Sequence, residues 1–211
     1  MSGIFTQFLQ TKIDTYQEPT RQGTSKGDPI GFSKQKFQCA VLSLSSDLQK
    51  DIAKACGVSH GMLRVWRTEA AFLKQTDDLA AEFAAIFWKA WVKYFDARGL
   101  TALNGTFDSP EGQNLIAPFV DVYQYGTPTL YAIYTNIPRG LSDFMVFAAF
   151  MFLRDPKKNT RSVKLNEQFL EIEKRMKDSL HNDAITILQK PDATSEELNL
   201  VLFYLQACKP S

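Results

Sequence analysis

The sequence holds few of the residues that metal sites and disulfide frameworks require. Its three cysteines, Cys39, Cys56 and Cys208, have no CxxC spacing, and its two histidines, His60 and His181, stand far apart without a nearby thiol. An odd number of scattered cysteines indicates reduced thiols in a cytoplasmic protein. A structural zinc ion needs about four ligands brought together. The sequence therefore predicts a cytoplasmic location and no metal site.

Motifs for nucleotide and nucleophilic chemistry are also absent from the sequence. It contains neither GxxxxGK[ST] nor GxGxxG, the patterns whose glycines cradle phosphate groups. A serine or cysteine nucleophile needs a histidine base, and neither histidine has a partner that the sequence reveals. The paired carboxylates at 77–78 and 196–197 fall at predicted helix starts, where the helix dipole accounts for them. We expect no catalytic residues, no cofactor and no enzyme activity.

No hydrophobic run of the sequence is long enough to cross a membrane as a helix. The strongest candidate, Phe144 to Leu153, is ten residues long (FMVFAAFMFL), whereas a spanning helix needs about 20. The segment from Met1 to Tyr16 lacks the basic start and unbroken apolar run of a signal peptide. We therefore expect a buried core helix at 144–153 and no association with membranes.

What the sequence does contain is enough apolar material for a sizeable core. Of its 211 residues, 45% are hydrophobic and 12% are aromatic, which is typical of a folded protein with one or two domains. The net charge of +1 is unevenly placed. Residues 1–67 carry nine Lys/Arg and five Asp/Glu, and residues 68–211 carry 15 and 18. A basic N-terminal part on an acidic body suits a site-specific DNA-binding protein better than one that coats nucleic acid.

The most informative segment runs from Leu48 to Thr68, LQKDIAKACGVSHGMLRVWRT. Its apolar and small residues have the spacing of a helix-turn-helix, in which a second helix enters the DNA major groove. Gly57 stands where the chain would leave the first helix in a left-handed conformation. Ser59 is placed to cap the second helix by accepting from the backbone N–H of residue 61 or 62. The expected core of the motif is Ile52, Ala53, Cys56, Gly57, Val58, Leu63 and Trp66.

The residues outside that core predict how the motif would contact DNA. Arg64 is the sharpest candidate for reading a base, because its guanidinium can donate two hydrogen bonds to guanine. Lys50 and Lys54 lie one turn apart on the first helix, which would cross the sugar-phosphate backbone. The predicted base contacts are His60, Gly61, Arg64 and Arg67. The predicted phosphate contacts are Lys50, Lys54 and Ser59.

Helical periodicity elsewhere predicts an all-α protein, with a three-helix headpiece followed by a larger helical domain. We expect an N-terminal helix and polar linker at 1–31, the helix-turn-helix headpiece at 32–75, and a ligand-binding and oligomerisation domain at 76–211. Residues 115–125 fit either a helix or a strand, and the helical surroundings favour a helix. The other expected helices lie at 3–16, 33–44, 127–136, 140–154, 163–181, 183–189 and from 194 or 195 to 205.

Several local signals locate helix starts and loops in this scheme. Ser45 or Ser46 is expected to cap the helix that contains Ile52, and Thr194 or Ser195 with Glu197 resembles a capping box. After Thr68 we expect a short helix, followed by a long one that Asp77 or Asp78 caps. Polar, Gly- and Pro-containing stretches predict loops at 17–31 and 99–113. The basic stretch at 157–161 fits an exposed turn, or else a phosphate contact.

The long helix carries a dense aromatic stripe. Its members are Leu79, Phe83, Ile86, Phe87, Ala90, Trp91, Tyr94 and Phe95, with Trp88 beside them. The i, i+3, i+4 spacing favours a core spine, since core packing is the commoner use of such a pattern. The alternative is a ligand box made of Phe83, Phe87, Trp91 and Tyr94.

The segment DIAKACGVSHGMLRVWRTEAAFL at 51–73 resembles the N-terminal headpiece of TetR-type transcriptional regulators. The positions that match the pattern IAxxxGVSxGxL are Ile52, Ala53, Gly57, Val58, Ser59, Gly61 and Leu63. The sequence departs from the family pattern in having the single Trp66 in place of a Tyr/Phe pair. The resemblance implies that His60, Gly61 and Arg64 face DNA. It also implies that an entirely helical body dimerises and holds a small apolar effector between its helices.

We therefore expect a transcriptional regulator that binds double-stranded DNA as a homodimer, since one short recognition helix reads too few bases to find a genomic site. Two other functions fit the same sequence. One is a phage or mobile-element assembly protein similar to terminase small subunits, whose helical body would close into a ring of eight or more subunits. The other is a helical interaction module that binds a partner protein and no DNA.

Overall fold

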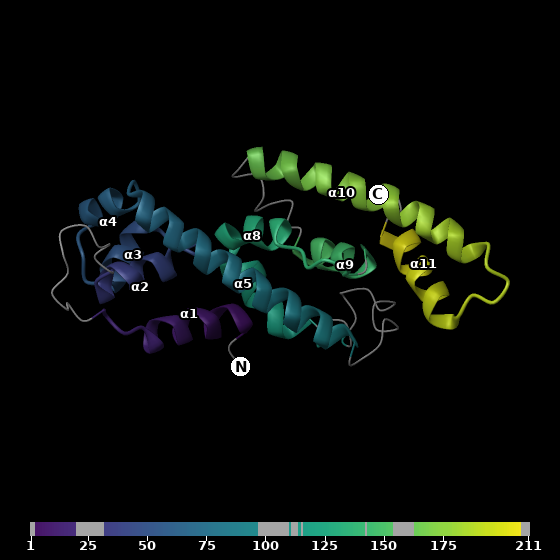
Figure 1. Ribbon diagram of the computed structural model, residues 1–211, viewed down its shortest axis with the longest axis horizontal. Coiled ribbons are helices and arrows are strands. Elements are labelled where there is room, and N and C mark those ends of the chain that lie inside the picture. The colour runs from purple at the N-terminus through teal and green to yellow at the C-terminus, as the bar shows by residue number, and fades with distance from the viewer. Residues whose placement is uncertain are drawn as a thin grey trace. The chain divides into compact units, whose positions relative to one another are not determined.

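The computed structural model describes residues 3–19, 32–96, 110, 114, 116–141, 143–153 and 163–207. Every regular element among these residues is an α-helix or a 3-10 helix, which confirms the all-α class (Figure 1). The chain groups into two compact units, Met1–Ala85 with Pro118–Asn136, and Ile86–Ala117 with Ile137–Ser211. This division falls inside one helix, α5, at Ala70–Asp96. The domain boundaries expected at residues 31 and 75 stay predictions.

The first unit contains the N-terminal helices and two short helices from the middle of the chain. The α-helices are α1 (Ile4–Thr15), α2 (Lys34–Leu42), α3 (Gln49–Ala55), α4 (His60–Trp66), the first part of α5, α7 (Val120–Tyr125) and α8 (Leu130–Thr135). The 3-10 helices η2 (Ala117–Phe119) and η3 (Thr127–Thr129) precede α7 and α8. Residues 117–125 are thus helical, as favoured from the sequence.

Helix α1 packs its apolar side on α5, which gives the expected helix at 3–16 its docking surface. The rings of Phe5 and Phe8 are buried, and their centroids lie 5.0 and 5.3 Å from that of Phe83. At the start of α1, the carboxylate of Asp121 from α7 accepts a hydrogen bond from the backbone N–H of Thr6 at 2.7 Å. This carboxylate takes the place of a side-chain cap, since Gly3 at the N-cap position has none.

Helix α2 begins with the cap that its sequence supplies. The hydroxyl of Ser33 accepts from the backbone N–H of Lys36 at 3.2 Å. The prediction that Ser45 or Ser46 caps α3 is wrong, because Leu48 is the N-cap residue and no side-chain bond closes that end. The hydroxyl of Ser45 instead donates to the carbonyl of Leu42 and contacts the Asp47 carboxylate.

Two helices are longer than their sequence signals suggest. Helix α5 runs unbroken through Asp77 and Asp78, so the expected short helix and later start are wrong. Asp78 pairs with Lys74 one turn earlier, and this i, i+4 pair supports an exposed helix interior. Helix α10 (Val163–Leu188) likewise spans the break expected at 182. Neither range contains Pro or Gly, so nothing in the backbone ends these helices early.

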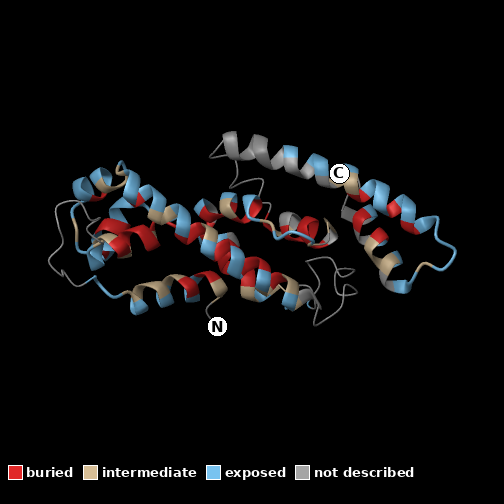
Figure 2. Cartoon of the chain, in the orientation of Figure 1, coloured by how far each residue is buried: buried red, intermediate tan, exposed pale blue. Residues whose placement is uncertain are grey.

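The second unit is built from the end of α5, α9 (Asp143–Leu153), α10 and α11 (Ser195–Ala207). The side chains at 145–149 of α9 are all buried, as expected for the apolar run (Figure 2). Helix α11 packs on α10, and Tyr204 donates from its hydroxyl to the carbonyl of Lys177 at 3.2 Å. Within the described part of the chain, no helix is both long and apolar enough to traverse a membrane.

The expected capping box opens α11. The backbone N–H of Glu197 donates to the hydroxyl of Thr194 at 3.2 Å, and the Glu197 carboxylate accepts from the backbone N–H of Thr194 at 2.9 Å. This reciprocal pair satisfies two donors at the helix start. Four other predictions lie wholly or mostly outside the described residues, namely the loops at 17–31 and 99–113, the basic stretch at 157–161 and the environment of Cys208.

Candidate nucleic-acid interface

The connection between α3 and α4 has the backbone geometry that the position of Gly57 predicts. Gly57 adopts φ +66°, in the left-handed region that favours glycine. The N–H of Val58 donates to the carbonyl of Ala53 at 3.0 Å, and the N–H of Gly57 donates to that of Lys54 at 3.1 Å. These two bonds form a Schellman motif, which satisfies the carbonyls at the end of α3.

Helix α4 begins at the cap that the sequence predicts. The hydroxyl of Ser59 accepts from the backbone N–H of Met62 at 3.1 Å, while Ser59 itself has an extended backbone. The Schellman motif and this cap leave only Val58 between the glycine and the capping serine. The turn is therefore short and defined at both ends. The Ser59 oxygen is engaged in capping. A contact between Ser59 and a DNA phosphate stays a prediction.

Burial in the motif largely follows the predicted core. Ile52, Ala53 and Cys56 on the α3 side are buried, and Leu63 of α4 is completely so. Val58 and Trp66 are only half-buried, so they close the edge of this small core instead of filling its centre. Helix α4 is thus held on the headpiece chiefly through Leu63.

The predicted DNA-contacting side chains are mostly exposed. Lys50 and Lys54 are exposed on α3, and His60 and Arg64 are exposed on α4. Arg67 differs, because it is half-buried at the C-terminal end of α4. Between residues 48 and 68 the chain carries four Lys or Arg and one Asp. The exposed surface of the motif is therefore basic.

The angular order around α4 shows which residues face away from the core. At about 100° per residue, Gly61 and Val65 lie about 160° from the inward-pointing Leu63, on its opposite side. His60 and Arg67 lie only about 60° and 40° from Leu63, at the rim of the helix. The set predicted from the sequence includes Gly61 and omits Val65, the other residue on this side. Val65 is 60% exposed, and Met62 on one flank is 47% exposed.

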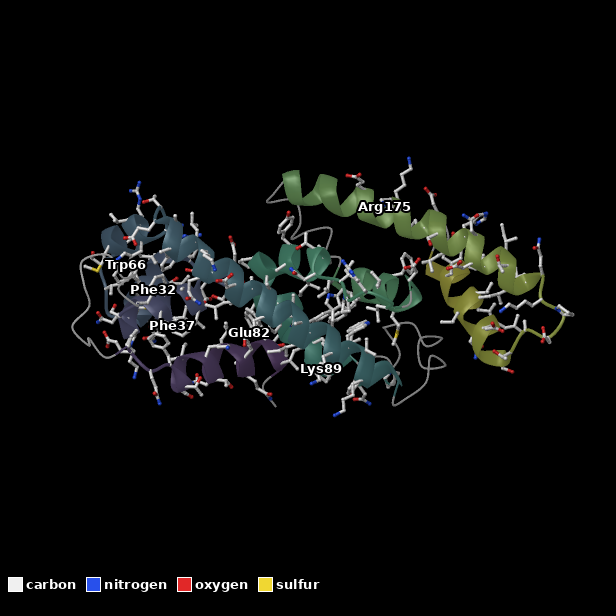
Figure 3. All side chains as sticks on the ribbon, viewed as in Figure 1. Phe32, Phe37, Trp66, Glu82, Lys89 and Arg175 are labelled. Carbon is white, nitrogen blue, oxygen red and sulfur yellow. The ribbon has the colours of Figure 1, made fainter. Side chains whose placement is uncertain are left out.

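A cluster of aromatic rings with one lysine holds the end of α4 against its neighbours (Figure 3). The ammonium group of Lys36 lies 4.9 Å from the ring centroid of Phe32 and 5.7 Å from that of Trp66. It also forms an ion pair with Glu69, just after α4. A cation above the face of an aromatic ring is attracted by the negative charge on that face. Trp66 therefore connects α4 to the start of α2.

The same cluster ties the end of α1 to α2. The rings of Tyr16 and Phe37 stack with centroids 3.8 Å apart, and the Tyr16 hydroxyl donates to the carbonyl of Phe32 at 2.6 Å. Burial, and secondarily the charge of Glu18, raises the pKa of the Tyr16 hydroxyl. The shift favours the protonated hydroxyl, the form that donates to Phe32. These contacts tie α1 and α2 together on the inner side of the headpiece, and among the described residues the outer positions of α4, such as Arg64 and Val65, are exposed.

Two buried thiols complete the inner side of the motif. Cys39 of α2 and Cys56 at the end of α3 are both free and buried. A hydrogen bond to the Cys56 side chain, together with burial, raises the pKa of the Cys39 thiol. Both act as small apolar side chains between α2 and α3. Among the described residues, no group of three or more His, Cys, Asp or Glu is placed to hold a metal ion.

The residues of the alternative ligand box are distributed over both units. Phe83 lies in the first unit, whereas Phe87, Trp91 and Tyr94 lie in the second. Phe83, Phe87 and Trp91 are fully buried, and Tyr94 donates from its hydroxyl to the carbonyl of Asn114 at 2.9 Å. The rings of Phe87 and Trp91 stack with centroids 5.6 Å apart. Each ring thus contributes to packing in its own unit.

Comparison with protein-family models, curated proteins and solved structures finds no match for the chain. A function is therefore inferred from the geometry and charge of α3 and α4.

The left-handed turn can be tested by replacing its glycine. We expect Gly57→Ala to lower the free energy of unfolding by about 1–2 kcal/mol, because a Cβ is strained at φ +66°. Space is not limiting, since the nearest atom to that Cβ would be Gln35 Nε2 at 3.8 Å. Urea denaturation followed by circular dichroism measures the change.

The matched control is Gly61→Ala, four residues further along. Gly61 is in helix α4, and a Cβ there would meet only the Ser59 hydroxyl at 3.9 Å. Because alanine favours helices over glycine, this variant should gain up to about 1 kcal/mol. Equal destabilisation by both substitutions would contradict the special role of Gly57.

Proposed function

We propose that the chain is a cytoplasmic transcriptional regulator that binds double-stranded DNA with α4 in the major groove. The observation that carries this proposal is the orientation of α4. Leu63 is completely buried, while Arg64 and the side of the helix opposite Leu63 are exposed. A recognition helix needs this arrangement, because one side must dock on the protein while the other contacts base edges.

The charges around α4 support the same proposal. Lys50 and Lys54 are exposed one turn apart on α3, the helix that crosses the DNA backbone in this type of motif. Lysines at such positions neutralise phosphates and release bound counterions. Arg64 would then read a base, since its guanidinium matches the two acceptors of guanine. His60 and Arg67, at the rim of α4, would contact bases or the backbone at the edges of the site.

The proposal includes dimerisation through the helical body. A helix of seven residues reads too few base pairs to select a genomic site alone. The second unit offers apolar surface for pairing, because five large apolar side chains are exposed among the described side chains of α10 and α11. These are Ile185, Leu188, Leu198, Leu202 and Leu205. The proposal also extends to a small apolar effector, whose entry would require the buried rings around Trp91 to separate.

Two substitutions separate base reading from backbone attraction. We expect Arg64→Ala to weaken binding to a preferred site by roughly 10- to 100-fold, because it removes a bidentate contact. Binding to random-sequence DNA should fall much less. Lys50→Ala should weaken both to a similar degree and reduce the slope of log affinity against log salt by about one.

The measurement is fluorescence anisotropy of labelled duplexes over a series of salt concentrations. The preferred duplex is first selected with the full chain from a random-sequence pool, and a scrambled duplex serves as the nonspecific reference. If Arg64→Ala reduced affinity for both duplexes by the same factor, Arg64 would not read a base. If neither duplex bound in a salt-dependent way, the proposed function would be wrong.

A further inference from the structure

The face of α4 that points furthest from the protein core is apolar. Gly61 and Val65 lie opposite the buried Leu63, and Arg64 and Met62 lie on the two flanks, each about 100° from Leu63. Val65 is 60% exposed and Met62 is 47% exposed. Leu63, in contrast, is completely buried and anchors α4 on the headpiece.

Gly61 makes this apolar face accessible. Helical side chains lean toward the N-terminus, so Val65 extends over the turn that contains Gly61, four residues earlier. Gly61 has no side chain to cover Val65, and even a Cβ at Gly61 would meet only the Ser59 hydroxyl within 4 Å. Valine is also a poorer helix former than Arg, Lys or Gln. Helix propensity therefore does not account for a valine at this exposed position.

The surroundings of this face indicate what it contacts. Arg64 is exposed on one flank of this face, Lys50 and Lys54 are exposed on the preceding helix α3, and Asp51 is the one acidic residue between 48 and 68. A basic surface with an apolar centre suits a DNA major groove, where the phosphates are negative and one base edge is apolar. That apolar group is the 5-methyl of thymine. A helical protein partner would need acidic groups to match the lysines and the arginine.

On the basis of the proposed function, we infer that Val65, with Met62 beside it, contacts a thymine 5-methyl group in the major groove. The thymine lies within one or two base pairs of the guanine that Arg64 reads, since Arg64 and Val65 are consecutive on the helix. Val65 is thus a specificity-determining residue of the same interface. It selects a base by apolar contact, while Arg64 selects one by hydrogen bonds.

The test removes only the methyl group. A duplex is selected with the full chain from a random-sequence pool and resynthesised with each thymine replaced, one at a time, by uracil. We expect one or two positions in each half-site where uracil weakens binding by about three- to fourfold, as for the loss of one buried methyl. In Val65→Ala, the thymine and uracil duplexes should bind equally well at that position.

The matched control is Leu48→Ala, which truncates an equally exposed apolar residue outside α4 and should preserve the thymine preference. A chain that selects a duplex but never distinguishes thymine from uracil overturns this inference and leaves the proposed function standing. A preference that persists in Val65→Ala also overturns it. A chain that selects no duplex contradicts the proposed function, and the apolar face would then fit a protein partner.

Discussion

Leu63→Ala is expected to lower the free energy of unfolding by about 2–5 kcal/mol and to abolish specific DNA binding. The side chain of Leu63 is completely buried between α4 and the rest of the headpiece. Its truncation removes apolar contacts and leaves a cavity that the short helix cannot fill by shifting. Without this anchor, α4 loses the docking that, under the proposed function, orients Arg64 toward a base.

The control for this prediction is Val65→Ala on the opposite side of the same helix. Val65 is mostly exposed, so its truncation should change the free energy of unfolding by no more than about 0.5 kcal/mol. Both variants are compared by urea denaturation with circular dichroism, and their binding to the selected duplex by anisotropy. Similar stabilities for the two would mean that α4 is not oriented through Leu63.

Trp91→Ala is expected to cost about 3–5 kcal/mol, the range for removing a buried aromatic side chain. Trp91 is fully buried in the second unit, where its ring stacks between Phe87 and Phe152 at centroid distances of 5.6 and 5.8 Å. Its indole N–H donates to the carbonyl of Met145 at 3.1 Å. The substitution therefore removes ring packing and a buried hydrogen bond together.

Two companion variants separate these contributions. Trp91→Phe keeps a ring and loses the indole hydrogen bond, so it should cost about 1–3 kcal/mol. Lys93→Ala, at an exposed position of the same helix, should change stability by no more than about 0.5 kcal/mol. The readout is the urea midpoint. A cost for Trp91→Ala as small as that of Lys93→Ala would contradict the assignment of Trp91 to the core.

Local signals with one physical solution were predictable from the sequence. A glycine between two helical segments, followed by Val and Ser, specified the left-handed turn at Gly57 and the cap at Ser59. The pair Thr194 and Glu197 specified the start of α11 in the same way. These signals depend on backbone hydrogen bonds among close neighbours, so they do not need knowledge of the tertiary packing.

Helix continuity was harder to predict, because capping residues are also tolerated inside helices. Asp77 and Asp78 could begin a helix, yet they lie exposed within α5, where Lys74 pairs with Asp78. The predicted buried side of α5 also differs in part from the observed one. Trp88, expected beside the stripe, is fully buried, whereas Ile86, expected within it, is 40% exposed. Which side of a long helix is covered depends on the elements that pack on it, and the sequence of the helix alone does not contain that information.

The sequence predicted the buried residues of the helix-turn-helix motif well and its exposed residues only in part. The inward set, led by Leu63, follows from apolar spacing. The outward set predicted from the sequence, His60, Gly61, Arg64 and Arg67, omits Val65, although Arg67 is half-buried and Val65 is 60% exposed. Exposed apolar side chains on a helix are common and carry no sequence signal of their own. Only their position opposite a buried anchor identifies them.

The central claim is that the side of α4 opposite Leu63 binds duplex DNA. An NMR titration of the isotope-labelled chain with the selected duplex tests it most directly, because it reports the backbone amides that sense the DNA. The account predicts that shift changes concentrate at residues 49–55 and 59–67, diminish with added salt, and leave α10 and α11 unperturbed. No shift with any duplex, or shifts confined to α10 and α11, would contradict it.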